Sequence, residues 1–153
     1  MHLKVITYRY QMLTPLFTTT AMTGPVLIIE DNRDIAEVLQ YGLENENLKT
    51  RVALTGEEGL AASLDETNAP SIILLDLLLP GMSGIELCRR LRKEPLTRKT
   101  PIIIVTARAS EADREASLKS GADDYIIKPF SVREVIARIN RLLQRRTEIH
   151  VTS

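Results

Sequence analysis

Four short apolar runs, each followed by polar side chains, limit what this chain can fold into more than any other feature. The runs cover residues 26–29, 72–75, 102–105 and 125–127, and they are followed by Glu30-Asp31, Asp76, Thr106 and Lys128. Continuous runs of β-branched residues and leucine are typical of strands buried on both faces, which occur in parallel sheets covered by helices. Ligands bind outside the carboxyl ends of such strands. The polar side chains should therefore converge at one edge of the sheet.

Helical patterns alternate with these runs. Asp34 is the predicted N-cap of a first helix, whose apolar face is Ile35, Val38, Leu39 and Leu43. Further helices are expected over 56–68, 83–94, 110–120 and 131–146, and Gly121 is the expected C-terminal cap of the fourth. The inward residues of that fourth helix are predicted to be Ala112, Ala116 and Leu118, whereas the last helix carries the stripe Val135, Ile136, Ile139, Leu142 and Leu143.

A more polar run over 50–54 predicts a further strand near a sheet edge. The alternation then gives five strands and five helices, and right-handed crossovers arrange them as an α/β fold with a doubly wound parallel sheet.

Composition excludes several classes of protein. The chain has 153 residues, of which 44% are hydrophobic, so it can form one domain with a substantial core. Its 20 basic and 20 acidic side chains cancel, which argues against binding nucleic acid through net charge. The single cysteine, Cys88, excludes an internal disulfide and a cysteine metal cluster. No run has the length of a membrane span, and a cytoplasmic location is expected.

The first 23 residues contain no acidic side chain and differ from the rest. We interpret residues 1–23 as a mobile arm, or as sequence upstream of a natural start at Met22; a docked helix or strand is the alternative. Residues 24–146 form the predicted domain, and residues 147–153 form a tail or the start of a linker.

Three carboxylates are candidates for a metal site. Glu30 and Asp31 are neighbours at one strand end and repel each other unless a cation lies between them. With Asp76 they form an oxygen-only set, which favours Mg²⁺ or Mn²⁺. The alternative for the Glu30-Asp31 pair alone is that it caps the next helix.

Asp76 is the predicted nucleophile, because a carboxylate can attack phosphorus to form an acyl phosphate. Phosphoryl transfer needs alignment and neutralisation of charge, which Lys128 supplies as a point charge and Thr106 as a hydroxyl donor. The Lys128-Pro129 junction is predicted to be cis, which would direct the lysine toward the site. The alternative for Lys128 is a solvated lysine before a turn.

Residues 26–146 resemble a response-regulator receiver domain of two-component signalling. The matching stretches are Ile-Ile-Glu-Asp-Asn at 28–32, Leu-Asp-Leu-Leu-Leu-Pro-Gly-Met-Ser-Gly at 75–84, Val-Thr-Ala-Arg at 105–108 and Gly-Ala-Asp-Asp-Tyr-Ile-Ile-Lys-Pro-Phe at 121–130. The resemblance implies a flavodoxin-like receiver fold and transfer of a phosphoryl group to Asp76 from a sensor histidine kinase or a phosphotransfer protein. It also implies the site residues: Glu30, Asp31, Asp76 and the Leu78 backbone carbonyl around Mg²⁺, Thr106 and Lys128 on the phosphoryl oxygens, and Thr106 with Tyr125 as the switch.

The predicted function is a phosphorylation switch, not an enzyme that acts on a separate metabolite. Two other functions are alternatives to it. A phosphatase of the haloacid-dehalogenase type needs an acid two positions after its nucleophile, and that position is Leu78, which cannot transfer a proton. A degenerate receiver that only scaffolds partners would not need all five site residues. A P-loop nucleotide enzyme is excluded, because the chain has no Gly-x-x-x-x-Gly-Lys-Ser/Thr segment.

The segment from Gly121 to Arg138 resembles the OmpR/PhoB subfamily. That resemblance implies control of transcription through a DNA-binding domain outside this chain, and a phosphorylation-enhanced homodimer. The implied dimer surface is Arg114, Asp123, Asp124, Glu134 and Arg138. Lys119 stands where an acid is common in the subfamily. A stand-alone regulator that acts by protein contacts is the alternative output.

Overall fold

Strands and helices alternate along the described part of the chain. The computed structural model describes residues 22–151, with side chains described through Arg145. Nearly all of the predicted arm, residues 1–21, lies outside the described residues. The elements are β1 (Val26–Ile29), α2 (Arg33–Asn45), β2 (Thr50–Ala53), α3 (Gly56–Ser63), β3 (Ile72–Leu75), α4 (Gly84–Lys93), β4 (Ile102–Thr106), α5 (Glu111–Lys119), β5 (Asp124–Ile127) and α6 (Val132–Val151).

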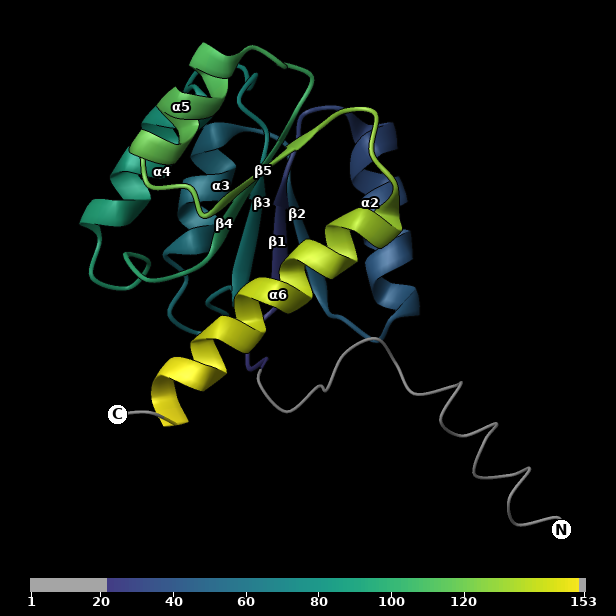
Figure 1. Ribbon diagram of the computed structural model, residues 1–153, viewed down its shortest axis with the longest axis vertical. Coiled ribbons are helices and arrows are strands. Elements are labelled where there is room, and N and C mark those ends of the chain that lie inside the picture. Colours follow the sequence, from purple (N-terminus) through teal and green to yellow (C-terminus); the bar gives the residue numbers. More distant parts are fainter. Residues whose placement is uncertain (1–21, 152–153) are drawn as a thin grey trace, which may run out of the picture.

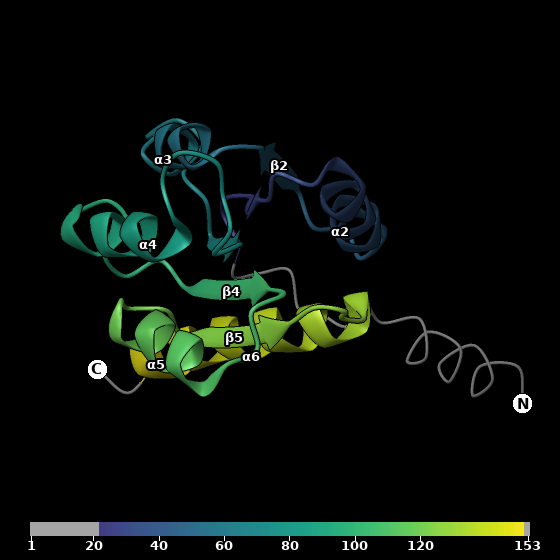
Figure 2. The ribbon, with the colours of Figure 1, turned by 90° about the horizontal axis from the view of Figure 1, so that it is seen from above.

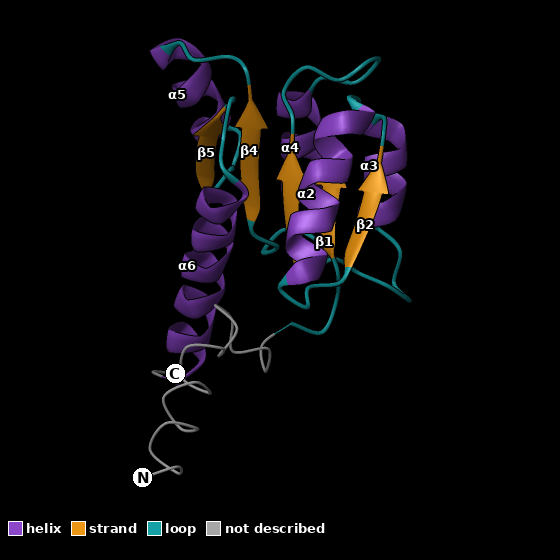
Figure 3. Ribbon diagram, turned by 90° about the vertical axis from the view of Figure 1, so that its right-hand side faces the viewer, coloured by secondary structure: helices purple, strands orange, loops and turns teal. Residues whose placement is uncertain are grey.

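The five strands form one parallel sheet in the order β2-β1-β3-β4-β5. Their arrows point the same way in Figure 3. The predicted α/β fold with a doubly wound five-stranded sheet is confirmed, and so is the edge position of β2. None of the described helices combines the length and apolar character needed to cross a membrane.

Alternate residues of each strand enter two separate cores. Val26 and Ile28 of β1 pack on the side of α2 and α6, whereas Leu27 and Ile29 pack on the side of α3 and α4. The same alternation continues through β3 and β4, whose residues are all buried. Figures 1 and 2 show α2 and α6 on one face of the sheet and α3 and α4 on the other. Burial on both faces explains why these strands are apolar throughout, apart from Thr106 at the end of β4.

The start of α2 differs from the prediction. Asn32 is the N-cap, and its side-chain oxygen accepts hydrogen bonds from the backbone N–H groups of Asp34 (3.0 Å) and Ile35 (3.2 Å). Asp34 lies in the first turn instead. The buried residues of the helix are Ala36, Leu39 and Leu43, and Val38 is 55% exposed. The prediction that Val38 faces the core was therefore wrong, because the side of α2 that faces the core is formed by Ala36, Leu39 and Leu43.

Helix α3 ends at Ser63, before the predicted position near Asn68. The Asp65 carboxylate accepts hydrogen bonds from both the backbone N–H and the hydroxyl of Thr67. Arg51 on the edge strand also pairs with Asp65 at 2.9 Å. Such a side-chain turn competes with helical backbone bonds and stops the helix.

Helices α4 and α5 begin as predicted, with Ser83 and Ser110 as N-caps. Within α5, however, the one buried residue is Ser117, and its hydroxyl donates to the Asp113 carbonyl at 2.8 Å. Ala112 and Leu118 are exposed and Ala116 is half-buried, so the predicted inward face was wrong except in part at Ala116. Helix α5 buries even less apolar surface than its sequence indicates.

Helix α6 carries the predicted stripe, and all five of its residues are buried: Val135, Ile136, Ile139, Leu142 and Leu143. The helix continues to Val151 instead of ending near Arg146. No proline or glycine interrupts residues 146–151. The predicted tail therefore begins as helix.

Candidate functional site

The carboxyl ends of four neighbouring strands meet at one edge of the sheet. Glu30 and Asp31 follow β1, Asp76 follows β3, Thr106 ends β4, and Lys128 follows β5. Backbone hydrogen bonds extend the strand pairing to these residues, since the N–H of Asp76 donates to the Ile29 carbonyl at 3.1 Å and the N–H of Lys128 to the Thr106 carbonyl at 2.8 Å. The sheet thus places the predicted polar residues side by side.

Lys128 lies between two buried carboxylates. Its ammonium Nζ is 2.8 Å from Asp76 Oδ2 and also donates to Glu30 Oε1. The side chains of Lys128, Glu30 and Asp76 are 15%, 4% and 6% exposed. The peptide bond between Lys128 and Pro129 is cis, as predicted. The structure therefore supports a lysine inside the site over a solvated lysine at a turn.

Three carboxylates form an acidic cluster beside this lysine. One oxygen each from Glu30, Asp31 and Asp76 lies within 4.8 Å of the others. Asp31 is exposed, and its carboxylate has no hydrogen bond or ion pair with any other side chain or backbone group in the described part of the chain. Hard carboxylate oxygens open to water are the donors that Mg²⁺ takes in proteins. The donor set fits such an ion.

Burial and charge shift two pKa values at the site. Burial raises the pKa of Glu30 to about 7; the hydrogen bond from Lys128 opposes this rise, and the charge of Asp76 adds to it. Burial disfavours the ammonium of Lys128, but its hydrogen bonds to Asp76 and Glu30 outweigh that effect and raise its pKa. Lys128 is thus held as a cation, while Glu30 is close to taking up a proton at neutral pH.

The loop after β3 contacts Asp76 through its backbone. The N–H of Leu78 donates to Asp76 Oδ1 at 3.1 Å, and the Leu78 side chain is 48% exposed. Asp76 Oδ1 is thereby oriented from one side and Oδ2 from the other by Lys128. The suggested role of the Leu78 carbonyl as a metal ligand stays a prediction.

Thr106 and Tyr125 both contact the backbone of Arg108. The hydroxyl oxygen of Thr106, a fully buried residue, accepts from the Arg108 N–H at 3.4 Å, and the Tyr125 hydroxyl donates to the Arg108 carbonyl. Tyr125 is 8% exposed, and its pKa is raised mainly by burial. Tyr125, which the family resemblance implies as part of the switch, therefore lies inward in this structure.

Two features of the site were missed from the sequence. The contact of Glu30 with Lys128 was not foreseen, because the acidic pair was assigned wholly to the metal. The Val-Thr-Ala-Arg stretch contains Arg108, but the sequence does not indicate that the Arg108 backbone joins Thr106 to Tyr125. The position of Arg108 two residues after the strand-end hydroxyl was the available signal.

The predicted dimer surface is partly occupied by bonds within the chain. Asp123 pairs with Arg92 at 2.9 Å, and Asp124 pairs with Arg138 at 2.7 Å. Glu134 Oε1 is 3.8 Å from Arg138, whereas Arg114 is exposed without an ion pair among the described side chains. Asp124 is buried, so its prediction as a surface residue was wrong: its position in β5 turns the carboxylate toward α6.

Comparison with known proteins adds independent evidence. Residues 26–140 match the family described as response regulator receiver domain. The chain is 43% identical over 124 residues to the phosphate regulon transcriptional regulatory protein PhoB of Rhizobium meliloti (strain 1021), covering 81% of this chain and 54% of that protein. It is 42% identical over 123 residues to the response regulator ArlR of Staphylococcus saprophyticus, covering 80% of this chain and 54% of that protein. The chain thus spans about half the length of these curated relatives.

Solved structures show the same likeness. The receiver domain of the Francisella response regulator 1452 has a TM-score of 0.73 and 38% identity, covering 81% of this chain and 99% of that chain. The response regulator DrrB of Thermotoga maritima, an OmpR/PhoB homolog, has a TM-score of 0.71 and 30% identity, covering 82% of this chain and 54% of that chain.

Proposed function

Because the chain belongs to the response regulator receiver domain family, a family of phosphoacceptors in two-component signalling, we propose that Asp76 is its phosphoacceptor. The observation that carries the proposal is the setting of this carboxylate, with the Lys128 ammonium 2.8 Å from Oδ2 and the acidic cluster beside it. Glu30 shares both of these neighbours at the end of β1, but Asp76 differs in that its other oxygen, Oδ1, accepts a hydrogen bond from the Leu78 N–H at 3.1 Å. The phosphoryl donor is proposed to be a sensor histidine kinase or a phosphotransfer protein.

In the proposed reaction a carboxylate oxygen of Asp76 attacks phosphorus. A new P–O bond forms, the bond from phosphorus to the donor histidine nitrogen breaks, and that nitrogen keeps the electron pair. Lys128 places positive charge beside the transferred oxygens. The Thr106 oxygen accepts from Arg108 in the described state, so its own hydroxyl proton is free to be donated to a phosphoryl oxygen.

Receiver domains bind Mg²⁺ at an acidic pocket, and we propose that Glu30, Asp31 and Asp76 hold it here, with Mn²⁺ as a substitute. The bound ion would neutralise negative charge on the attacking carboxylate and the phosphoryl oxygens. Asp31, exposed and unpaired, is the residue best placed to take the ion without first breaking a bond to Lys128.

The experiment is phosphorylation by acetyl phosphate with Mg²⁺, followed by intact-protein mass spectrometry. We expect the gain of one phosphoryl group that depends on Mg²⁺ and is absent in Asp76→Asn. Unmodified wild-type protein would favour the scaffold, and rapid phosphate release would favour the phosphatase. We expect persistence, because the side chain two residues after Asp76 is Leu78, which offers no proton.

For the output, we propose transcriptional control by a longer protein in which residues 24–146 are the receiver domain. The two curated relatives with OmpR/PhoB-like receivers support this: one is named a transcriptional regulatory protein, and this chain aligns with about half of it. The stand-alone regulator is the second candidate, and a cytoplasmic location is proposed for both. The gene sequence beyond Ser153 tests the choice directly.

A further inference from the structure

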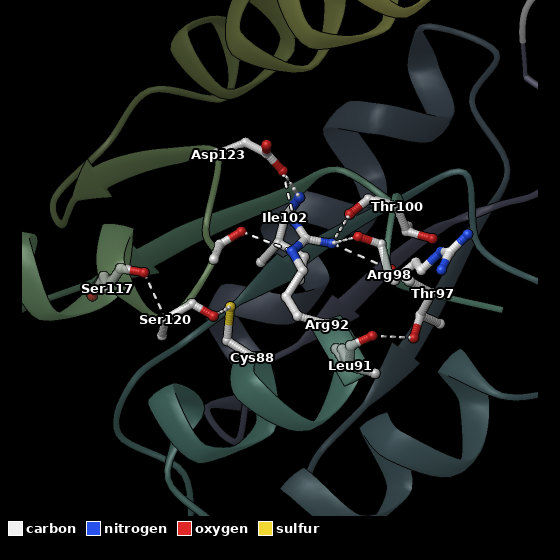
Figure 4. Close-up of polar contacts among 11 residues, drawn as sticks. Cys88, Leu91, Arg92, Thr97, Arg98, Thr100, Ile102, Ser117, Ser120 and Asp123 are labelled. Atoms are coloured by element: carbon white, nitrogen blue, oxygen red, sulfur yellow. Dashed lines mark hydrogen bonds and ion pairs between the residues drawn. The ribbon is translucent and has the colours of Figure 1, made fainter. Parts of the chain in front are cut away.

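Arg92, in the last turn of α4, donates hydrogen bonds to segments that lie far apart in the sequence. Its Nε donates to the Gly121 carbonyl at 2.8 Å and its Nη1 to the Thr100 carbonyl at 2.6 Å. Nη1 also lies 3.2 Å from the Thr97 carbonyl and 3.3 Å from that of Arg98. Figure 4 shows the guanidinium at the centre of these acceptors. One side chain therefore joins α4 to the loop before β4 and to the end of α5.

Asp123 completes this cluster. Its Oδ2 accepts from Arg92 Nη2 at 2.9 Å and from the Ile102 backbone N–H at 2.8 Å. The Asp123 backbone N–H donates in turn to the Ile102 carbonyl at 2.8 Å. The residue before β5 is thus hydrogen-bonded to the first residue of β4 and to α4, as drawn in Figure 4.

The residues between α5 and β5 pack closely against the Arg92 side chain. Gly121 has a φ of +110°, and a Cβ at this position would lie 2.6 Å from Arg92 Cγ. The preceding residue, Ser120, accepts from Cys88 Sγ of α4 at 3.5 Å. The C-terminal end of α5 therefore packs directly against α4.

The N-terminal end of α5 is held by weaker contacts. Arg108 pairs with Asp113 at 3.2 Å, but the Arg108 side chain is 52% exposed. Exposed ion pairs contribute little, roughly 0–1 kcal/mol. Ser117 is the one buried residue within α5, so packing does not compensate for this weakness. The two ends of the helix are anchored unequally.

We propose that Arg92 is a positioning residue that fixes the C-terminal end of α5 to α4, so that α5 pivots about this end when Asp76 is phosphorylated. The proposal rests on the proposed function, because it needs Asp76 to be the phosphoacceptor. The signal enters at the opposite end of the helix, where the Arg108 backbone contacts Thr106 and Tyr125. A helix with one fixed and one loose end converts a small shift at the loop into a rotation.

The chemistry of the cluster requires arginine. A planar guanidinium donates in several fixed directions at once, to carbonyls on two segments and to a carboxylate. Lysine at this position could pair with Asp123 but could not reach all the carbonyls together. Arg92→Lys is therefore expected to keep the ion pair and to loosen the end of α5.

The test is residue-resolved amide hydrogen exchange by NMR, with and without beryllofluoride and Mg²⁺. The Ala122 and Gly121 amides, bonded to Ser117 and Leu118, report on the fixed end, and the Arg114 amide, bonded to Ser110, reports on the loose end. In wild type, beryllofluoride should change exchange at Arg114 and leave Gly121 and Ala122 nearly unchanged.

Arg92→Gln should speed amide exchange at Ala122 roughly tenfold or more, as expected for losing hydrogen bonds to a charged donor. Beryllofluoride should then change exchange at both ends of α5.

The matched control is Arg90→Gln, an exposed arginine of the same helix without an ion pair among the described side chains, and it should behave as wild type. If Arg92→Gln does not fold, Arg92→Lys is measured at the same amides. Equal responses at both ends of wild-type α5, or wild-type exchange at Ala122 in the Arg92 variants, would overturn the pivot. Failure of acetyl phosphate to modify wild-type Asp76 would instead overturn the proposed function.

Discussion

At the scale of single residues, one lysine forms ion pairs with two carboxylates. Lys128 contacts both Asp76 and Glu30, while Asp31 has no such partner in the described part of the chain. The three acids are therefore not equivalent, although they lie within 4.8 Å of one another. Substitutions at these positions should separate metal binding, proton binding and signalling.

Asp31→Asn tests the metal site. The change removes the charge of the one carboxylate in the cluster that is not already neutralised, so we expect Mg²⁺ affinity to fall by roughly tenfold or more. Calorimetry or NMR titration is suitable, because the chain has no tryptophan for fluorescence. Asp34→Asn, a nearby carboxylate outside the cluster, is the control and should bind as wild type. Unchanged affinity in Asp31→Asn would remove the metal assignment.

Glu30 should give the metal-free protein a distinct pH dependence. Its folded pKa of about 7 lies above the ordinary value of 4.5, so the folded state binds a proton more tightly than the unfolded state. The stabilisation is then fully present below about pH 4.5 and is lost as pH rises to about 7, on the order of 3 kcal/mol at most. Urea unfolding followed by circular dichroism checks this. Glu30→Gln should flatten the pH profile over this range, and an unchanged slope would contradict the assignment.

Lys128→Ala should separate phosphorylation from its structural consequence. The variant leaves Glu30 and Asp76 without their buried cation, so we expect lower stability without Mg²⁺ and partial recovery when Mg²⁺ is added. Some phosphorylation should persist, but the accompanying NMR shifts around Tyr125 should be lost. Lys119→Ala, an exposed lysine on α5, is the control. Wild-type shifts in Lys128→Ala would show that another group senses the phosphoryl charge.

At the scale of elements, the buried strands and the apolar stripe of α6 were predictable, whereas the start of α2, the end of α3 and the inward face of α5 were not. The runs that became β1, β3 and β4 have apolar residues at every position, which leaves no competing assignment. Errors occurred where a polar residue took an unexpected place: Asn32 at the start of α2, Asp65 after α3 and Ser117 inside α5. Local hydrogen bonds decided these positions, and periodicity does not reveal them.

The candidate site shows the same division. The strand ends fixed the positions of Asp76, Thr106 and Lys128, because parallel neighbours end at one edge. The Arg92 cluster could not be foreseen, since its acceptors are backbone carbonyls of loops whose course depends on the folded chain. Side-chain bonds to loop backbone leave no periodic signal in a sequence.

Tyr125→Phe tests the link between β5 and the loop before α5. The change removes the hydrogen bond from the tyrosine hydroxyl to the Arg108 carbonyl and keeps the ring buried. We expect a loss of about 1 kcal/mol in the free energy of unfolding, and a smaller response of α5 to beryllofluoride by NMR. Tyr41→Phe, on an exposed tyrosine of α2, is the control. A full α5 response without the hydroxyl would exclude Tyr125 from the switch.

At the scale of the whole molecule, the question is whether activated copies associate. Dimerisation is typical of the OmpR/PhoB subfamily, and most of the charges implied for it here are already engaged within one chain. Asp123 is bonded to Arg92 and Asp124 to Arg138, whereas Arg114 is exposed and unpaired among the described side chains. A second copy would have to compete with these internal pairs, so the balance between monomer and dimer should be close.

We therefore expect a weak dimer that is strengthened by phosphorylation and weakened by salt. Each exposed ion pair contributes roughly 0–1 kcal/mol, and added salt screens such pairs over about 10 Å at 0.1 M. Light scattering with and without beryllofluoride, at low and high salt, measures this. Arg114→Glu should weaken the activated dimer, because it reverses the one unpaired charge of the predicted surface, whereas Arg90→Glu on α4 should not. If the activated wild type stays monomeric at high concentration and low salt, a regulator that acts through contacts with other proteins accounts better for the chain, because the charges of β5 and α6 then serve only its own fold.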